Sequence, residues 1–211
     1  MHIDVYLDFV CPWCRIGVRN LHDALDEWRQ SHDETVTIRY YSFILDPDIP
    51  PEGEPFLKMM EKKMGGAEAV ARITASTAAA GAAVGVTLAF DRITVAPNSR
   101  LAHRLLAITP AHKQEELVQR LSSAYFEEGA DIGSLTVLLA LAQGIGLSPE
   151  ELEQRLQSGD GEELVQASLQ RGKKLGITGV PYLIFNNRYA LSGAYPKEEM
   201  LGLLLQVARP A

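Results

Sequence analysis

Residues 3–14 read IDVYLDFVCPWC, and this stretch decides the fold. The alternating apolar residues over Ile3–Phe9 predict a β-strand, and the amphipathic stretch Arg15–Gln30 that follows predicts a helix. The two cysteines of the chain, Cys11 and Cys14, therefore lie where a first strand passes into a first helix. A thiol-disulfide active site is chemically reasonable at such a junction.

The spacing of the two cysteines suits redox chemistry. If Cys11 is the N-cap of the helix, Pro12 takes the first helical position, where its fixed φ fits and its missing N–H is not needed. Cys14 then lies one turn further along the same face, with the two Cα atoms roughly 5–6 Å apart, which a disulfide allows. Free N–H groups of the first turn and the helix dipole favour the thiolate of Cys11. We therefore expect Cys11 to attack and Cys14, further in and more buried, to resolve.

Two other interpretations of this motif are weaker. A structural disulfide would close a loop of two intervening residues and would therefore constrain little of the unfolded chain. A zinc site needs about four ligands, but the chain has no further cysteine. His22 lies eight residues beyond Cys14 on the same expected helix, roughly 12 Å along its axis, and is too far away to share a metal. We therefore expect no metal site.

The composition is that of a soluble globular protein. The chain has 211 residues, 46% of them apolar and 22% charged, which suits one good-sized domain or a core domain with a large insertion. The formal net charge of −7 argues against non-specific nucleic-acid binding. The uncharged stretch Ile73–Phe90 is rich in Ala, Gly, Ser and Thr, so we expect a small-residue helix packed closely inside the protein rather than a membrane span.

The N-terminus bears on the compartment. Met1-His2-Ile3 leads directly into the first strand, without the basic and apolar regions of a secretory signal. A mature periplasmic protein could have lost its signal and is the alternative. We expect a cytoplasmic protein, and in that compartment a Cys-x-x-Cys pair is more often catalytic or redox-sensing than structural.

The rest of the chain divides into strand-forming ends and a helical middle. Thr35–Phe43 is rich in β-branched and aromatic residues and predicts a second strand, and the breaker-rich stretch 46–55 predicts a linker. Tyr182–Asn186 and Arg188–Ser192 predict a hairpin, followed by a closing helix over Pro196–Ala208. Between these ends the sequence predicts seven helices: Phe56–Met64, Ala67–Ala83, Ser99–Ile108, Lys113–Glu128, Ser134–Gly144, Pro149–Gln157 and Glu162–Leu175.

Strands at both ends need partners, so we expect the two ends to build one sheet. The expected class is therefore α/β, with a discontinuous core of residues 1–54 and 176–211 and an inserted helical domain of residues 55–175.

Five motifs spread over nearly the whole chain carry a family resemblance: DFVCPWC (8–14) with Ile16-Gly17, LDP (45–47) with PEG (51–53), Asn98-Ser99 with AHRL (102–105), GITGVP (176–181) and ALSGA (190–194). Together they resemble the thioredoxin fold, and within it the DsbA family with a large all-helical insertion. The motifs outside the cysteine and Val-Pro segments resemble the FrnE-like branch of cytoplasmic oxidoreductases.

The resemblance implies roles for several residues. Pro181 would be cis and would pack beside the cysteines, and the backbone of Val180 could pair with an extended substrate. An ordinary trans proline that opens a strand is the alternative. Trp13 should be partly exposed beside Cys11, where it could contact substrate, and the Pro12-Trp13 dipeptide should tune the redox poise.

Other candidate residues have competing interpretations. Asp8 could accept or relay the proton of the resolving thiol, or it could be a solvated carboxylate at a strand end. The resemblance places the segment of His103 near the mouth of the site, although a surface or packing role is the alternative. Three methionines could line an adaptable apolar groove for substrates, or could face the core or a lid: Met59, Met60 and Met64.

These observations predict a thiol-disulfide oxidoreductase that acts through Cys11-Pro12-Trp13-Cys14 and a mixed-disulfide intermediate. The substrate would be a protein or small molecule that carries a thiol or a disulfide. No metal or organic cofactor is required, and glutathione or a reductase could recycle the pair. A homodimer is compatible with the sequence.

Two alternatives remain. Kappa-class glutathione transferases and hydroxychromene carboxylate isomerases resemble this chain in the insertion and the Val-Pro loop. They typically carry serine where Cys11 stands and bind glutathione, so the presence of both cysteines argues against them. A non-catalytic redox-sensing binding module is the second alternative, and it would tolerate the loss of Cys14.

Overall fold

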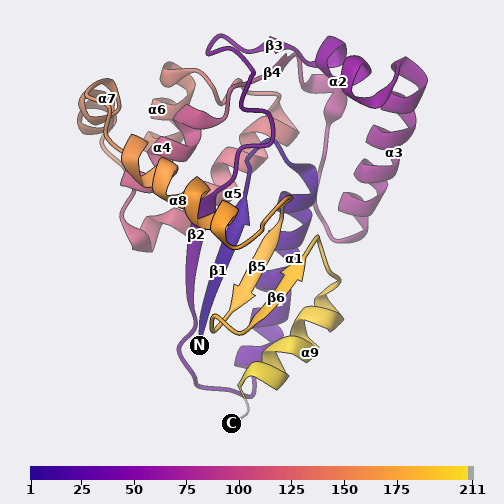
Figure 1. Ribbon diagram of the computed structural model, residues 1–211, viewed down its shortest axis with the longest axis vertical. Helices are drawn as coiled ribbons and strands as arrows, with labels where there is room; N and C mark the ends of the chain where they lie inside the picture. The colour runs from indigo at the N-terminus through magenta and orange to yellow at the C-terminus, as the bar shows by residue number, and fades with distance from the viewer. Residues whose placement is uncertain (209–211) are drawn as a thin grey trace.

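A four-stranded mixed sheet forms the centre of the computed structural model, which describes residues 1–208 (Figure 1). The strand order is β2-β1-β5-β6, and β1 (His2–Leu7) runs parallel to β2 (Thr37–Ser42). β5 (Tyr182–Phe185) runs antiparallel to both β1 and β6 (Tyr189–Ser192). The expectation that the two ends of the chain share one sheet is therefore confirmed.

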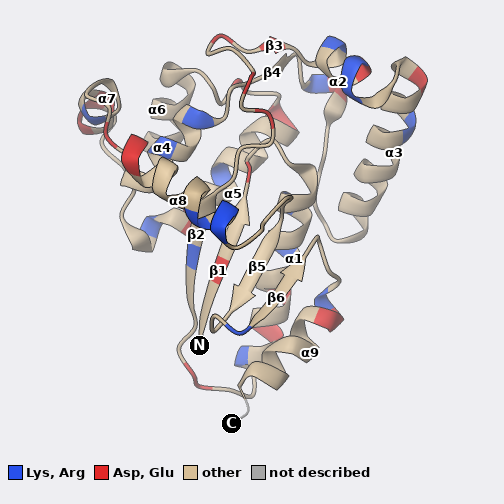
Figure 2. Ribbon diagram, viewed as in Figure 1, with Lys and Arg blue, Asp and Glu red and all other residues tan. Residues whose placement is uncertain are grey.

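Helices cover both faces of this sheet. α1 (Pro12–Arg29) and α9 (Lys197–Val207) pack together behind it in Figure 1, and α8 (Glu162–Lys174) crosses in front of β1 and β2. Four large apolar residues of α1 are buried because they recur at helical spacing on its sheet-facing side: Ile16, Leu21, Leu25 and Trp28. The charged residues of α8 complement its helix dipole, because acidic residues lie in its first turn and basic residues in its last turn (Figure 2).

The remaining elements lie between β2 and α8 in the sequence. Their bounds match the expected helices to within two residues: α2 (Phe56–Met64), α3 (Ala67–Ala83), α4 (Arg100–Ile108), α5 (Ala111–Glu128), α6 (Leu135–Gly144) and α7 (Pro149–Gln157). α5 starts two residues earlier than expected because Pro110 serves as its N-cap and the helix continues directly from it. The expected linker and the segment between α3 and α4 contain a short antiparallel pair, β3 (Glu54–Pro55) with β4 (Val95–Ala96), and one 3-10 turn, η1 (Phe90–Arg92).

One expectation about this region is wrong. α3 is not packed inside the protein, because it buries only Val70, Thr77 and Gly81 and turns its other faces to solvent. Its exposed faces are rich in alanine, whose side chain is small, so exposing them costs little. No helix within residues 1–208 has the length and apolar character needed to cross a membrane.

Helix α8 packs on the sheet although its sequence falls in the expected insertion. A Cβ atom at Gly172 would lie 3.3 Å from the Tyr6 ring of β1, so glycine allows the close approach of helix and strand. The division into a core of residues 1–54 and 176–211 and an inserted domain of residues 55–175 stays a prediction, and residues 209–211 lie outside the described part of the chain.

Candidate active site

The start of α1 holds both cysteines. Cys11 is the N-cap, with extended backbone angles (φ −91°, ψ 110°), and Pro12 occupies the first turn. The backbone N–H of Cys14 donates to Cys11 Sγ over 3.2 Å, so one of the free N–H groups of the first turn points at this sulfur. The expected cap arrangement is confirmed, and both thiols are free.

The two cysteines are almost equally buried. Cys11 is 5% exposed and Cys14 is 3% exposed, whereas Trp13 between them is 43% exposed. Cys14 is the more buried of the two, as expected, but only slightly, because the helical segment α2–α3 and the segment before β5 also cover Cys11. Trp13 is partly exposed, as expected.

Val180 and Pro181 lie beside the cysteine pair. The Cys11 thiol donates to the Val180 carbonyl oxygen over 3.6 Å, and the Val180–Pro181 peptide bond is cis, as the resemblance implies. A Cβ atom at Gly17 would approach Pro181 Cγ to 2.9 Å, so the glycine lets α1 come close to this segment. The sequence-predicted residues Cys11, Cys14, Val180 and Pro181 are therefore brought together in one place.

A buried polar pair lies behind the cysteines. Asp8 is buried, and its Oδ2 atom accepts the backbone N–H of Leu45 over 2.8 Å. His103 of α4 is also fully buried, and its Nε2 atom lies 3.3 Å from Asp8 Oδ1, while its ring packs on Phe9. The alternatives of a solvated carboxylate and a surface histidine are therefore both wrong. Asp8 and His103 belong to separate motifs of the sequence, and the structure joins them.

Cys14 is held in its neutral form. Burial raises the pKa of the Cys14 thiol well above its ordinary value, and the hydrogen bond and charge of Cys11 and the charge of Asp8 act in the same direction. Cys14 and Asp8 also border one small cavity of about 10 Å³, close to the minimum that a water molecule needs.

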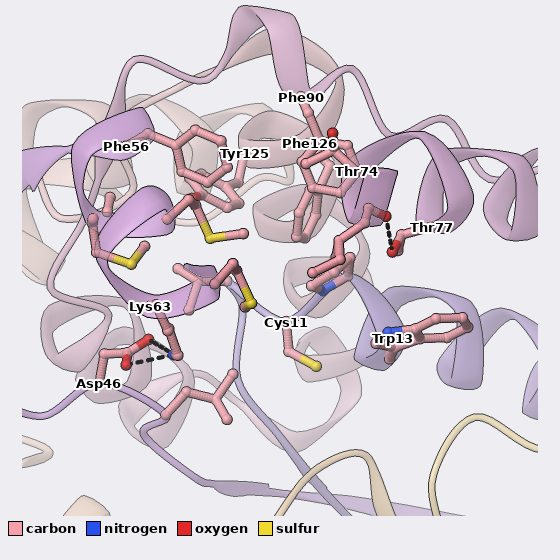
Figure 3. Close-up of a pocket in the computed structure, with 18 of the residues that line it drawn as sticks. Cys11, Trp13, Asp46, Phe56, Lys63, Thr74, Thr77, Phe90, Tyr125 and Phe126 are labelled. Carbon is pink, nitrogen blue, oxygen red and sulfur yellow. Dashed lines mark hydrogen bonds and ion pairs between the residues drawn. The ribbon is translucent and has the colours of Figure 1, made fainter. Parts of the chain in front are cut away.

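A larger apolar pocket opens on the other side of Cys11 (Figure 3). This Cys11 pocket has a volume of about 270 Å³ and lies between the cysteine and helices α2 and α3. The three candidate methionines of α2 all line it: Met59, Met60 and Met64. Aromatic rings form another part of its wall: Phe56, Phe90, Tyr125 and Phe126.

Comparison with known proteins shows the family and the fold to which this site belongs. The sequence model of the family described as the DSBA-like thioredoxin domain matches residues 2–204, which is nearly the whole chain. The chain belongs to the DsbA-like thioredoxin family. The expected thioredoxin-like α/β fold with a helical insertion is thereby confirmed.

Three proteins illustrate the range of this DsbA-like family. A probable DsbA oxidoreductase, SCO1869 from Streptomyces coelicolor, has a TM-score of 0.87 and 28% identity, and the match covers 100% of this chain and 92% of the other. The cytosolic disulfide reductase DsbM from Pseudomonas aeruginosa, solved with GSH, has a TM-score of 0.70 and 18% identity over 99% of this chain and 100% of the other. The uncharacterized protein YwbO of Bacillus subtilis is 24% identical over 94% of this chain and 92% of its own length.

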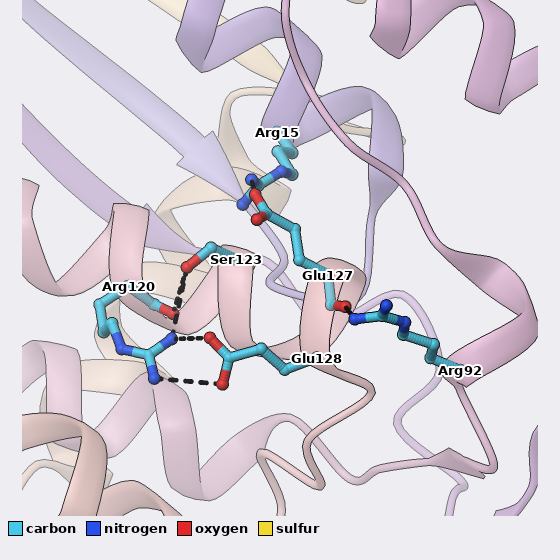
Figure 4. A network of polar contacts seen from close by, with 6 residues as sticks. All are labelled: Arg15, Arg92, Arg120, Ser123, Glu127 and Glu128. Atoms are coloured by element: carbon cyan, nitrogen blue, oxygen red, sulfur yellow. Dashed lines mark hydrogen bonds and ion pairs between the residues drawn. The ribbon is translucent and has the colours of Figure 1, made fainter.

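An arginine that the sequence analysis missed anchors the DsbA-like cysteine helix to α5 (Figure 4). Arg15, the residue after Cys14, forms an ion pair with Glu127, whose backbone carbonyl also accepts a hydrogen bond from Arg92 over 2.9 Å. No sequence signal could identify this pair, because Arg15 and Glu127 are 112 positions apart. The ion pair fixes the first turn of α1 against the helical part of the protein.

The buried Cys14 thiol makes the stability of this DsbA-like protein sensitive to alkaline pH. Above about pH 8.5 the unfolded chain loses the Cys14 proton while the folded state keeps it, because the folded pKa is raised. The free energy of unfolding of the reduced protein should therefore fall by up to about 1.4 kcal/mol per pH unit between pH 8.5 and 9.5. Urea unfolding across this range measures the slope. The Cys14→Ser variant, which has no thiol at this position, should lack that contribution, and an equal slope in both proteins would contradict the assignment.

Proposed function

We propose that this DsbA-like protein is a thiol-disulfide oxidoreductase of the FrnE-like branch, with Cys11 as the attacking sulfur and Cys14 as the resolving sulfur. The observation that carries the proposal is the N-cap position of Cys11, with the Cys14 N–H directed at its sulfur. A backbone N–H donor and the positive end of α1 both stabilise a sulfur anion at that point. The free, neutral Cys14 thiol lies one turn away, where it can form the second bond.

The reaction balances with the two cysteines alone. The Cys11 thiolate attacks one sulfur of a substrate disulfide, a bond forms between Cys11 and that sulfur, and the other sulfur leaves as a thiolate. Cys14 then gives up its proton and attacks Cys11 Sγ, which releases the second substrate thiol. The substrate disulfide is reduced to two thiols and the protein pair is oxidised to a disulfide. The reverse sequence would oxidise a substrate dithiol.

Neighbouring residues support these steps in the proposal. Asp8 accepts the Cys14 proton across the small cavity that both residues border. His103 positions the Asp8 carboxylate through the contact at Oδ1. The Val180 backbone pairs with an extended substrate, with Pro181 beside it.

The two residues between the cysteines also have roles in this proposal. Pro12 sets the start of the helix, and Trp13 offers an exposed ring to substrate.

The proposed partners are proteins or small molecules with a thiol or disulfide, and glutathione or a reductase recycles the pair. A cytoplasmic location is supported by the description of the similar DsbM as cytosolic. Within residues 1–208, no group of three or more His, Cys, Asp or Glu side chains is placed to hold a metal.

The Cys14→Ser variant tests the proposal against both alternatives. It should react with a disulfide once and then stop, so that a mixed disulfide on Cys11 accumulates and is visible by intact-protein mass spectrometry. Wild-type protein should instead form the Cys11–Cys14 disulfide. Full turnover without Cys14 together with glutathione conjugation would favour the transferase or isomerase alternative. A wild-type pair that forms no disulfide in a glutathione redox buffer would leave only a binding role.

A further inference from the structure

The burial of Cys11 restricts what can reach its sulfur. Cys11 is 5% exposed, and the Cys11 pocket borders it between Trp13, Val180 and the helices α2 and α3. A substrate sulfur must therefore arrive with the rest of its molecule partly inside this pocket. Its volume of about 270 Å³ is slightly below the usual range of about 300–1,000 Å³ for small-molecule sites. It has room for one bulky group, and a folded protein surface would have to present its disulfide on a narrow projection.

Polar side chains along the pocket are already paired. Lys63 at the rim donates to both carboxylate oxygens of Asp46, over 2.6 and 2.7 Å, so the two charges cancel. The hydroxyls of Thr74 and Thr77 each donate over 2.8 Å to carbonyls of their own helix, those of Val70 and Ile73. A charged group entering the pocket would lose its hydration without gaining a counter-ion.

The phenol of Tyr125 is a further polar group of the pocket, and it is neutral, as is the indole of Trp13. Tyr125 lines the pocket, and burial raises its pKa, so its hydroxyl stays protonated at every physiological pH. The rest of the wall offers methionine side chains that adapt to the shape of an apolar ligand, and aromatic rings that stack on it. The pocket therefore matches an uncharged apolar group in both chemistry and size.

We propose that the preferred substrate of this site is a small disulfide whose sulfur carries a bulky uncharged group, which enters the pocket between α2, α3 and Cys11. This inference rests on the proposed oxidoreductase function and names its substrate class. In the forward reaction, Cys11 forms a bond with the sulfur nearer the apolar group and the other half leaves as a thiolate. Cys14 then displaces the apolar thiol from Cys11, so the protein pair is oxidised to the Cys11–Cys14 disulfide and has given the two electrons that reduce the substrate disulfide to two thiols.

Single-turnover kinetics on reduced protein can test this preference without any external reductant. The probes are the symmetrical disulfides of Ac-Phe-Cys-NH₂, Ac-Gly-Cys-NH₂ and Ac-Glu-Cys-NH₂, with oxidised glutathione and insulin as charged and folded references. We expect the Phe disulfide to react about 10- to 200-fold faster than the Gly disulfide, the range for filling an apolar pocket. The Glu disulfide, oxidised glutathione and insulin should react more slowly still. Quenched-flow mass spectrometry of the protein measures each rate.

Two variants of α2 form a matched pair. Met60→Lys places a charge in the pocket and should abolish the preference for the Phe disulfide, whereas Leu57→Lys changes an exposed residue of the same helix outside the pocket and should keep it. Complete alkylation of Cys11 by iodoacetamide shows that the thiol is free and reachable in each variant. Equal rates for the three peptide disulfides, or insulin as fast as the Phe disulfide, would overturn the inference while leaving the oxidoreductase function standing. No reaction with any disulfide would instead overturn that function.

Discussion

Replacing Cys11 with serine is expected to lower the rate of disulfide reduction by at least about 10³-fold, to the uncatalysed background. Cys11 is the sulfur at the N-cap of α1, with the Cys14 N–H directed at it and the Cys11 pocket beside it. A serine oxygen cannot form a disulfide with substrate, so neither the mixed disulfide nor the resolved pair can form. Thiol release from the Ac-Phe-Cys-NH₂ disulfide measures the effect.

A matched comparison separates loss of chemistry from loss of fold. Cys11→Ser and Cys14→Ser remove the same atom type from neighbouring buried positions, so their effects on the free energy of unfolding should be similar. Only Cys14→Ser should retain the first chemical step and accumulate a mixed disulfide. If Cys14→Ser alone reacted at the background rate while Cys11→Ser formed the mixed disulfide, the roles of the two sulfurs would be reversed.

His103→Leu is expected to lower the free energy of unfolding by about 3 kcal/mol. The leucine removes the partner of Asp8 Oδ1 and leaves a fully buried carboxylate with the Leu45 N–H as its remaining hydrogen bond. An imidazole that carries a proton on Nε2 donates to this carboxylate, and its other nitrogen, Nδ1, is buried without a partner among residues 1–208. Equilibrium urea denaturation measures the loss.

Two further variants distinguish hydrogen bonding from simple packing. His103→Gln carries an amide N–H near the position of Nε2 and should recover at least half of the lost stability, whereas leucine and glutamine would be equivalent if His103 only filled space. Combining His103→Leu with Asp8→Asn should cost about 1–2 kcal/mol less than the sum of the single changes, because the two side chains interact directly. Purely additive effects would contradict the pair.

Local signals explain why so much of the fold could be predicted from the sequence. The Ser148 hydroxyl accepts the Glu151 N–H over 3.3 Å at the start of α7, and Pro149 occupies its first turn, as the sequence indicates. The turn residues Asn186 and Asn187 both have positive φ between β5 and β6. Such features depend on residues a few positions apart, so they can be recognised in a single sequence.

The parts that could not be predicted depend on contacts between distant segments. Asp8 and His103 are 95 positions apart, and nothing within either motif specifies how α4 docks behind the cysteines. The burial of Cys11 could not be predicted for the same reason. It results from the placement of α2 and α3 over a cysteine that the local geometry alone would leave accessible. The sequence could therefore indicate the two candidate sulfur atoms and the methionines, but not the enclosed shape of the pocket around Cys11.

The strand order also determines when the protein can become active during its synthesis on the ribosome. β1 lies between β2 and β5, with Ile3 opposite Phe185, and Val180 contacts Cys11. A nascent chain that ends before residue 180 has its reactive cysteine motif but lacks both the central partner of β1 and one wall of the site. Until the last segment emerges, β1 presents an unpaired edge that is open to misassembly. Catalytic competence is thus delayed until translation is nearly complete, and truncated chains would be inert and prone to aggregate.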